Sequence, residues 1–152
     1  MQQLMVGEHQ LGTATLVSRT SLTAPTTDTL KAALYLASAT INASTTAYTA
    51  TGEVTGTNYT AGGITVTNAT APASTNTSST AGTAYWTPSA SLTYTTVTLS
   101  TAFDCVLFYN STQSNKAISV HTFGSQTITA GTFTLTMPAN TTAAALLRLS
   151  TT

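Results

Sequence analysis

Alternation with a period of two residues is the feature that most constrains how this chain can fold. Near the end of the chain, for example, Phe133, Leu135 and Met137 alternate with threonines. Successive side chains of a β-strand point to opposite faces, whereas an amphipathic helix needs apolar residues three and four positions apart. Thr and Val dominate these segments, and their branched side chains pack well in strands but lose rotamer freedom in helices. The sequence therefore predicts an all-β protein.

Turn-forming residues separate the alternating segments at fairly even intervals. Asn, Gly and Pro gather at residues 110–115, 61–63, 130–131 and 138–140, where they favour turns over extended strands. About eight short strands with such spacing are typical of a sandwich, and we expect a jelly-roll or immunoglobulin-like arrangement, with the strand count favouring the jelly roll. The clearest predicted strands are Leu30–Ala37, Gly63–Ala69, Ser91–Ser100, Cys105–Asn110, Ala117–Gly124, Thr132–Pro138 and Ala145–Ser150, with weaker candidates at Thr46–Ala50 and Gly82–Thr87.

The beginning of the chain differs from the rest. Its apolar clusters have no spacing that would let them close on themselves, so we predict an extended N-terminal arm over residues 1–28 and a β-sandwich domain over residues 29–152. An apolar segment that cannot fold alone commonly adds a strand to another chain or fills a groove there. The alternative is an ordinary first strand with a frayed terminus. If the arm is an interface, the contact residues are Leu4, Met5, Val6, Leu11, Leu16 and Val17.

Charged residues are scarce in this sequence. They make up 5% of it, against about 25% in an ordinary soluble protein. The four basic and four acidic residues are scattered and give a formal net charge of +0. Nucleic acids and anionic membranes are bound through clustered Lys and Arg, so we expect neither as a partner. A weakly charged surface does not repel its neighbours, which suits a subunit that works in an assembly.

Two features bear on targeting. The first twenty residues lack the basic start and continuous apolar core of a signal peptide. The longest apolar run, AAALLRL at residues 143–149, is far too short to span a bilayer. We therefore expect no membrane partner on this ground as well.

The sequence offers little material for catalysis. Outside the arm, the candidate acid–base residues are Glu53, Asp104 and His121, and acid–base catalysis requires such groups to converge in a cleft. We interpret Asp104 as a turn cap and His121 as a packed or half-exposed strand residue. The sole cysteine, Cys105, lies in an apolar run, where a buried thiol acts as a small hydrophobe. We find no metal-ligand cluster, phosphate-binding loop or nucleophile motif, and so expect no enzyme activity, metal or cofactor.

Carbohydrate binding is an alternative, because β-sandwiches often bind sugars through exposed aromatic side chains. The residues available for such a platform are Tyr59, Tyr85, Trp86 and Tyr94. The opposing interpretation is that Trp86 ends a strand and is buried beneath the turn at Pro88.

Two parts of the chain resemble small virion structural proteins of tailed bacteriophages. The first part opens on a K-x-A-L-Y strand and continues as T-x-Y-T-x-x-G-E-V-x-G-x-x-Y-x-x-G-G. In the second, a strand ending in Tyr-Asn turns through Asn-Lys-Ala into a strand that closes on Phe-Gly. The likeness covers about Leu30 to Leu149 and leaves the arm outside. The matching residues are Lys31, Ala33, Leu34, Tyr35, Tyr48, Gly52, Glu53, Val54, Gly56, Tyr59, Gly62, Gly63, Tyr109, Asn110, Asn115, Lys116, Ala117, Phe123 and Gly124.

The resemblance implies a capsid decoration (cement) protein at the virion surface, commonly a homotrimer that clamps neighbouring major capsid subunits. Its partners would then be the major capsid protein and copies of itself. Alternatives are a head–tail connector, a tail-associated virion protein, or a carbohydrate- or host-binding module. The residues themselves add one local expectation: Glu53, next to Gly52, is placed to accept backbone N–H hydrogen bonds in a turn.

Overall fold

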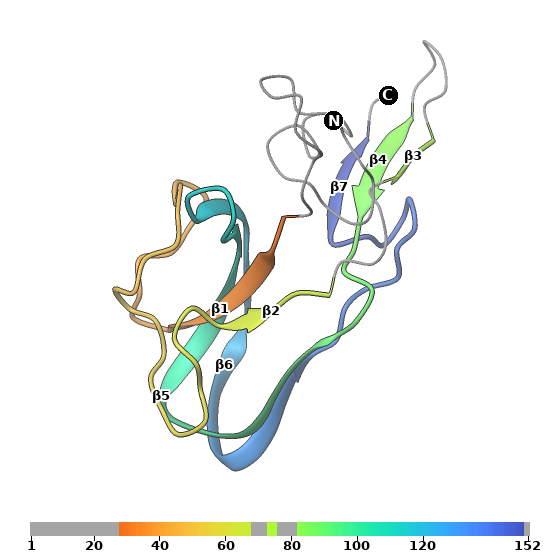
Figure 1. Ribbon diagram of the computed structural model, residues 1–152. Coiled ribbons are helices and arrows are strands. Elements are labelled where there is room, and N and C mark those ends of the chain that lie inside the picture. Colours follow the sequence, from red (N-terminus) through yellow and green to blue (C-terminus); the bar gives the residue numbers. More distant parts are fainter. Residues whose placement is uncertain (1–27, 68–72, 76–81, 151–152) are drawn as a thin grey trace. The chain divides into compact units, whose positions relative to one another are not determined.

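The computed structural model describes residues 28–67, 73–75 and 82–150. These residues form strands, turns and irregular segments but no helix, and every strand pair is antiparallel. The all-β prediction is confirmed. The seven strands found there, drawn in Figure 1, are β1 (Leu30–Leu36), β2 (Ile64–Thr65), β3 (Ala73–Ser74), β4 (Thr83–Trp86), β5 (Leu92–Asn110), β6 (Lys116–Leu135) and β7 (Leu147–Ser150).

The strands form two sheets, which belong to two compact units. The larger unit, residues 29–66 and 92–135, contains a four-stranded sheet with the order β2-β1-β5-β6. The smaller unit contains the sheet β3-β4-β7 and, among the described residues, residues 28, 67, 73–75, 82–91 and 136–150. The proposed arm, apart from Asp28, lies outside the described residues, as do Leu4, Met5, Val6, Leu11, Leu16 and Val17.

The smaller unit is held by short pairings. β4 pairs with β3 and β7, and the Thr83 hydroxyl lies 3.0 Å from that of Ser150. Within β7, Arg148 donates from its guanidinium to the carbonyl oxygens of Thr142 and Ala143 and so fixes the turn at residues 141–144. Trp86 is fully buried at the end of β4, as the second interpretation of this segment predicted.

β5 and β6 form one long hairpin where the sequence predicts four short strands. Asp104 was expected to cap a turn, but it lies inside β5, which runs without a break from Leu92 to Asn110. The predicted turn at Ala130–Gly131 is instead a bulge within β6: Ala130 has φ of 46°, and the pairing register shifts there. Pairing resumes on both sides of this bulge, so the turn-forming residues bend β6 instead of ending it.

The bent hairpin folds over its own aromatic side chains. Phe103 pairs with Gln126 in the ladder, whereas Phe133 pairs with Tyr94, several positions further along. The rings of Phe103 and Phe133 nevertheless meet edge to face, with centroids 5.0 Å apart. Such contact requires the ribbon to curl back on itself, as Figure 1 shows for β5 and β6. Phe103 and Phe133 are both buried, and their contact adds to the apolar core of the bent hairpin.

β1 is buried on both faces. Ala32, Ala33, Leu34 and Tyr35 are all fully buried, and the small Ala side chains allow neighbouring segments to approach closely. One face packs with Cys105, Leu107 and Tyr109 of β5 and with the residues that follow β1. On the other face, the Tyr94 hydroxyl donates a 2.8 Å hydrogen bond to the carbonyl of Ala32. The core of this unit therefore lies around β1.

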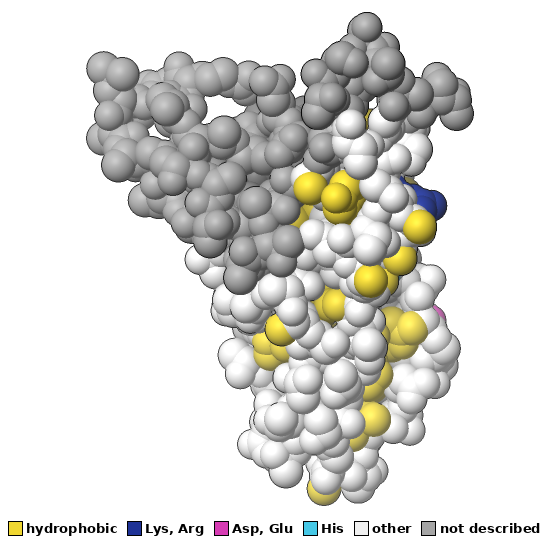
Figure 2. Space-filling model, turned by 90° about the vertical axis from the view of Figure 1, so that its right-hand side faces the viewer, with side chains coloured by type: hydrophobic (Ala, Val, Ile, Leu, Met, Phe, Trp, Pro, Cys, Tyr) yellow, Lys and Arg dark blue, Asp and Glu magenta, His cyan; other side chains and the backbone are white. Residues whose placement is uncertain are grey.

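Few charged side chains reach the described surface. Figure 2 shows a face composed almost wholly of uncharged groups, with hydrophobic side chains scattered over it and only small areas of basic or acidic colour. Among the described residues, the large hydrophobic side chain that is exposed is Leu149.

Gly63 provides a test of this packing. It has φ of +72°, and a Cβ there would overlap the carbonyl oxygen of Ala32. We expect Gly63→Ala to lower the free energy of unfolding by about 2–4 kcal/mol, because both the backbone conformation and the close approach to β1 are lost. Urea unfolding measures this as a lower midpoint at an unchanged slope.

The matched control is Gly124→Ala. At Gly124 the nearest atom to an added Cβ is the side-chain nitrogen of Gln126 at 4.0 Å, so the site is open. We expect a change within about 1 kcal/mol there. Equal effects at the two glycines would contradict the close approach of Gly63 to β1.

Candidate functional site

The side chain of Glu53 lies at the centre of a buried hydrogen-bond network. It is 7% exposed, and its carboxylate accepts hydrogen bonds from the Tyr48 hydroxyl at 2.6 Å, the Tyr59 hydroxyl at 2.8 Å and the Gly62 amide at 2.7 Å. None of these donors is a cation. A buried carboxylate is costly unless its oxygens are hydrogen-bonded, and charge-assisted hydrogen bonds are the stronger class. The network therefore replaces the water that Glu53 loses.

The backbone around Glu53 is shaped by glycines. Gly52 has φ of 79° and Gly62 has φ of 84°, both in the left-handed region that glycine adopts readily. The turn at Gly62 aims its amide at the carboxylate. Residues 52–54 then run along the outer edge of β1, where the Leu36 amide donates to Gly52 and the Val54 amide donates to Leu34. The loop of residues 46–63 is thus fastened to the sheet on both sides of Glu53.

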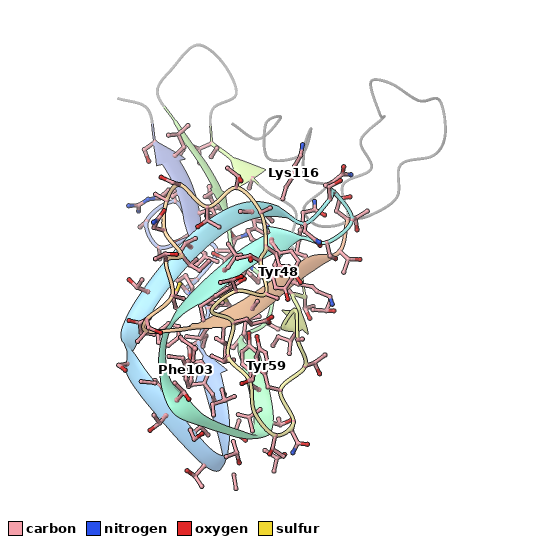
Figure 3. The ribbon with its side chains drawn as sticks, turned by 90° about the vertical axis from the view of Figure 1, so that its left-hand side faces the viewer. Tyr48, Tyr59, Phe103 and Lys116 are labelled. Atoms are coloured by element: carbon pink, nitrogen blue, oxygen red, sulfur yellow. The ribbon has the colours of Figure 1, made fainter. Side chains whose placement is uncertain are left out.

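A second tier of contacts ties the network to the core strands. The Tyr59 hydroxyl accepts a 3.0 Å hydrogen bond from the Leu34 amide while it donates to Glu53. The Tyr109 hydroxyl donates to the carbonyl of Gly62 at 2.8 Å, so both the N–H and the C=O of Gly62 are hydrogen-bonded by side chains. The rings of Tyr48 and Tyr109 stack with centroids 4.8 Å apart. Figure 3 shows Tyr48 and Tyr59 against the core sheet.

The tyrosines of this network are held in the protonated form. Burial, followed by the hydrogen bond to Glu53 and its charge, raises the pKa of Tyr48. Burial likewise raises the pKa of Tyr59, where the hydrogen bond from Leu34 opposes the shift and Glu53 adds to it. Burial also raises the pKa of Tyr35 to about 12, and its hydroxyl donates to the carbonyl of Thr49 at 2.6 Å. These phenols therefore remain neutral donors at neutral pH.

The arrangement orders the chain and leaves Glu53 poorly placed for proton transfer. Both carboxylate oxygens are engaged, one by a phenol and the other by a phenol and an amide. A general base must instead reach a proton on a bound substrate. The chemistry that this site supports best is the fixing of the 46–63 loop against β1.

The other predicted acid–base residues have different neighbours. Asp104 is half-buried within β5. His121 lies on β6, where its ring nitrogen is 3.1 Å from the Ser119 hydroxyl and its ring meets Phe108 edge to face; burial lowers its pKa. The described residues contain no group of three His, Cys, Asp or Glu that could hold a metal ion.

Cys105 is where the sequence places it, in the core. It is 4% exposed, and burial raises the pKa of its thiol to about 11. A thiol with a raised pKa is a poor nucleophile at neutral pH. Cys105 is therefore a packing residue.

The proposed aromatic platform for sugars is wrong in part. Trp86 and Tyr94 are 0% and 3% exposed, so neither can stack on a ligand in this structure. The Tyr94 ring packs instead between Tyr59 and Phe133. The Tyr59 hydroxyl donates to Glu53, and its partly buried ring stacks on Tyr94.

Residues from both parts of the chain that carry the resemblance meet at Glu53. Tyr48, Glu53, Tyr59 and Gly62 of the first part form the network, and Tyr109 comes from the second part. Sequence reasoning anticipated a backbone N–H donor to Glu53, and the Gly62 amide confirms it. It missed the two phenols, although one charge flanked by tyrosines in an otherwise neutral stretch was the available signal.

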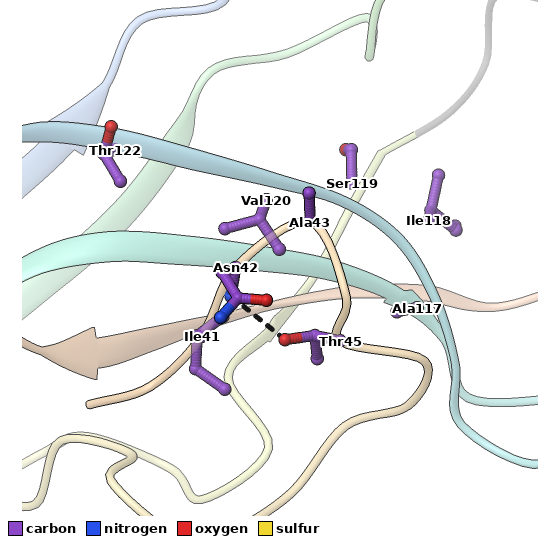
Figure 4. Close-up of a pocket in the computed structure, with 9 residues that line it drawn as sticks. All are labelled: Ile41, Asn42, Ala43, Thr45, Ala117, Ile118, Ser119, Val120 and Thr122. Carbon is purple, nitrogen blue, oxygen red and sulfur yellow. Dashed lines mark hydrogen bonds between the residues drawn. The ribbon is translucent and has the colours of Figure 1, made fainter.

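A hollow of about 500 Å³ lies between the start of β6 and the turn at residues 42–45 (Figure 4). One wall is the turn at residues 42–45. There the side-chain oxygen of Asn42 accepts a 2.8 Å hydrogen bond from the backbone amide of Ser44, and the backbone amide of Asn42 donates to the Thr45 hydroxyl at 3.0 Å. These bonds preform the turn. The lining residues are Ile41, Asn42, Ala43, Thr45, Ala117, Ile118, Ser119, Val120 and Thr122.

Comparison of the chain with protein-family models, with curated proteins and with solved structures finds no match. Within the described ranges, no segment forms a helix with the length and apolarity needed to cross a membrane.

A matched pair of substitutions tests the network. Tyr48→Phe removes one donor to Glu53, and we expect it to cost about 1–2 kcal/mol of unfolding free energy. Tyr59→Phe also leaves the buried Leu34 amide without its acceptor, and we expect about 2–4 kcal/mol. Chemical denaturation of both variants measures the difference.

Glu53→Gln completes this test as a double-mutant cycle with Tyr59→Phe. The amide retains the shape of the side chain but turns one acceptor into a donor that faces other donors. Because both substitutions break the same contact, their effects should sum to more than the double variant shows. Simple additivity of Glu53→Gln and Tyr59→Phe would refute the arrangement described for Glu53.

Proposed function

We propose that the chain is a viral structural protein, a capsid decoration (cement) protein that stabilises the head of a tailed bacteriophage by clamping major capsid subunits. The observation that carries the proposal is the use made of the family-like motif. In this motif Glu53 accepts hydrogen bonds from Tyr48, Tyr59 and the backbone of Gly62, so its polar residues hold the fold together, as a structural protein requires. The resemblance to virion structural proteins supplies the role.

The neutral surface supports this role. With four basic and four acidic residues in 152, the chain has little charge with which to repel a neighbour. Such a surface is a liability for a free monomer and is tolerable for a subunit covered on several sides. The proposal therefore assigns the chain to the capsid surface, with no part for nucleic acid, membrane, cofactor or catalysis.

The proposed partners are the major capsid protein and copies of the chain itself, as a homotrimer. In this proposal the arm, residues 1–28, lies along adjacent chains and buries Leu4, Met5, Val6, Leu11, Leu16 and Val17. Burial of apolar surface is worth about 25 cal/mol per Å² before ordering costs are subtracted. Repeated over a shell, this contact would oppose the outward pressure of packaged DNA.

The finer fold type is also part of the proposal. We propose a jelly-roll or immunoglobulin-like sandwich as the arrangement of the antiparallel sheets. Both types keep a β core with connecting loops free to contact neighbouring subunits.

Binding to capsids tests the proposal. The purified chain is mixed with empty capsids of the virus that encodes it, and the bound copies per particle are counted after sedimentation. We expect saturable binding at many positions over the shell, and loss of most binding when residues 1–20 are deleted. Leu16→Asp should weaken binding strongly and Thr15→Asp less, since the apolar positions carry the contact.

Three results would contradict the proposal. The first is absence of binding by a folded chain, and the second is binding that the deletion leaves unchanged. The third is a small number of copies confined to one vertex, which would indicate a head–tail connector.

A further inference from the structure

The hollow of about 500 Å³ at the start of β6 has no part in the Glu53 network, since none of its lining residues bonds to that carboxylate. Its volume lies within the range of small-molecule sites, about 300–1,000 Å³. Such sites combine apolar walls with a few polar groups that orient the ligand. Figure 4 shows the two walls of the hollow, which are the turn at residues 42–45 and the first part of β6.

Aliphatic side chains form the firm part of the hollow. Ile41 and Val120 are partly buried and pack on the core cluster that contains Tyr35 and Leu107. Ala43 also lines the hollow, and its small side chain leaves room there. The apolar surface that a ligand would meet is therefore held in place by the core of the unit.

Uncharged polar groups line the rest of the hollow. The side-chain oxygen of Asn42 is occupied by the Ser44 amide, whereas its side-chain nitrogen has no hydrogen-bond partner among the described residues. The Thr45 hydroxyl accepts from the backbone amide of Asn42 and retains its own proton to donate. Thr122 is exposed and brings a further hydroxyl. In the described chain, the outer edge of β6 at residues 119–122 also has no backbone partner.

The lining limits the chemistry of a ligand. None of the nine lining residues has an ionisable side chain. A charged ligand would lose water in the hollow without meeting an opposite charge, which is costly. A purely apolar ligand would cover the side-chain nitrogen of Asn42 and the hydroxyls of Thr45 and Thr122 without pairing them. The hollow therefore suits an uncharged ligand that has hydrogen-bonding groups as well as apolar surface.

The pairing register of β6 argues against a peptide strand as the ligand. Ile118 is the extra residue of a bulge, because its neighbours Ala117 and Ser119 pair with consecutive residues of β5. The register shifts again after Thr122, so the regular edge is limited to residues 119–122. An added strand needs a longer regular edge for its main-chain hydrogen bonds, whereas a small ligand needs only one or two such groups.

We propose that this hollow binds a neutral sugar residue, a pyranose of the hexose or N-acetylhexosamine class. The hydroxyls of a pyranose both donate and accept, which matches Asn42, Thr45 and Thr122, and its C–H groups pack on Ile41 and Val120. The site is separate from the aromatic platform considered above, and its apolar wall is aliphatic. Binding is therefore weak, with a dissociation constant of about 1–10 mM. This inference goes beyond the proposed function and does not depend on it.

A titration followed in amide NMR spectra tests the proposal on the full chain. The isotope-labelled protein is titrated with glucose, galactose, mannose and N-acetylglucosamine, each as the free sugar and as the methyl glycoside. We expect at least one of them to cause saturable shifts of the Asn42 side-chain signal and of the backbone amides of residues 118–122. Binding of the methyl glycoside would indicate the end of a glycan as the ligand, and binding of the free sugar alone would indicate a free sugar.

Two matched pairs of variants locate the site. Ala43→Leu fills part of the hollow and should weaken binding at least about tenfold, whereas Ala47→Leu, exposed and outside the lining, should leave it unchanged. Thr122→Val keeps the branched shape but removes a hydroxyl, and should weaken binding about threefold or more. Thr129→Val, at an exposed position of β6 outside the hollow, should bind as the unchanged chain does.

Several results would overturn the proposal. One is the absence of saturable shifts with every sugar, and another is a set of shifts that Ala43→Leu and Thr122→Val leave unchanged. Hexanol that binds as tightly as the best sugar would show that the hydroxyls are not recognised. A Thr-rich peptide that binds more tightly than any sugar would show strand addition instead. Since no capsids are present, failure here leaves the capsid-binding test independent.

Discussion

The hydrogen bonds to the carboxylate of Glu53 are the interaction on which the larger unit depends. Through Tyr48, Tyr59 and Gly62 they connect parts of the 46–63 loop that have no regular secondary structure of their own. Through Tyr59 and the backbone of residues 52–54 they connect that loop to β1. Ordering a loop of this length costs conformational entropy, and the hydrogen bonds to Glu53 help to offset that cost.

The same interaction explains the asymmetry of the sheet. The loop that Glu53 holds closes the edge of β1, crosses the core face, and reaches β6 only at Lys116 and Ala117. Beyond Ala117 the loop no longer pairs with β6. The hollow lies there, between β6 and the turn at Asn42. One buried carboxylate therefore holds the loop that covers the edge of β1 and that meets β6 only at its first residues.

Sequence reasoning predicted the fold class and the ends of several strands well, because alternation and branched residues are local signals. β1 ends one residue before the predicted Ala37, and the turn at residues 111–115 was expected. It failed at Asp104 and at Ala130–Gly131, where a ladder partner distant in the chain keeps a turn-prone segment in a strand. Propensity is overridden there by tertiary pairing.

The site was harder to predict than the fold. Glu53 and the glycines drew attention, but only the fold brings Tyr109 to Gly62 and the Leu34 amide to Tyr59. Sequence shows that a lone charge needs partners, and it does not show which of six tyrosines provide them. The hollow beside β6 also has no sequence signal, since its walls come from residues 41–45 and 117–122.

Native-state hydrogen exchange of the Gly62 amide tests the central claim most directly. If the Glu53 carboxylate holds the 46–63 loop to β1, this amide opens only when the unit unfolds, and its exchange reports a free energy close to that of global unfolding. The amide of exposed Thr60, two residues earlier, is the internal reference and should exchange much faster. Exchange of Gly62 at the rate of Thr60 would show that the loop opens by itself, and would contradict the account.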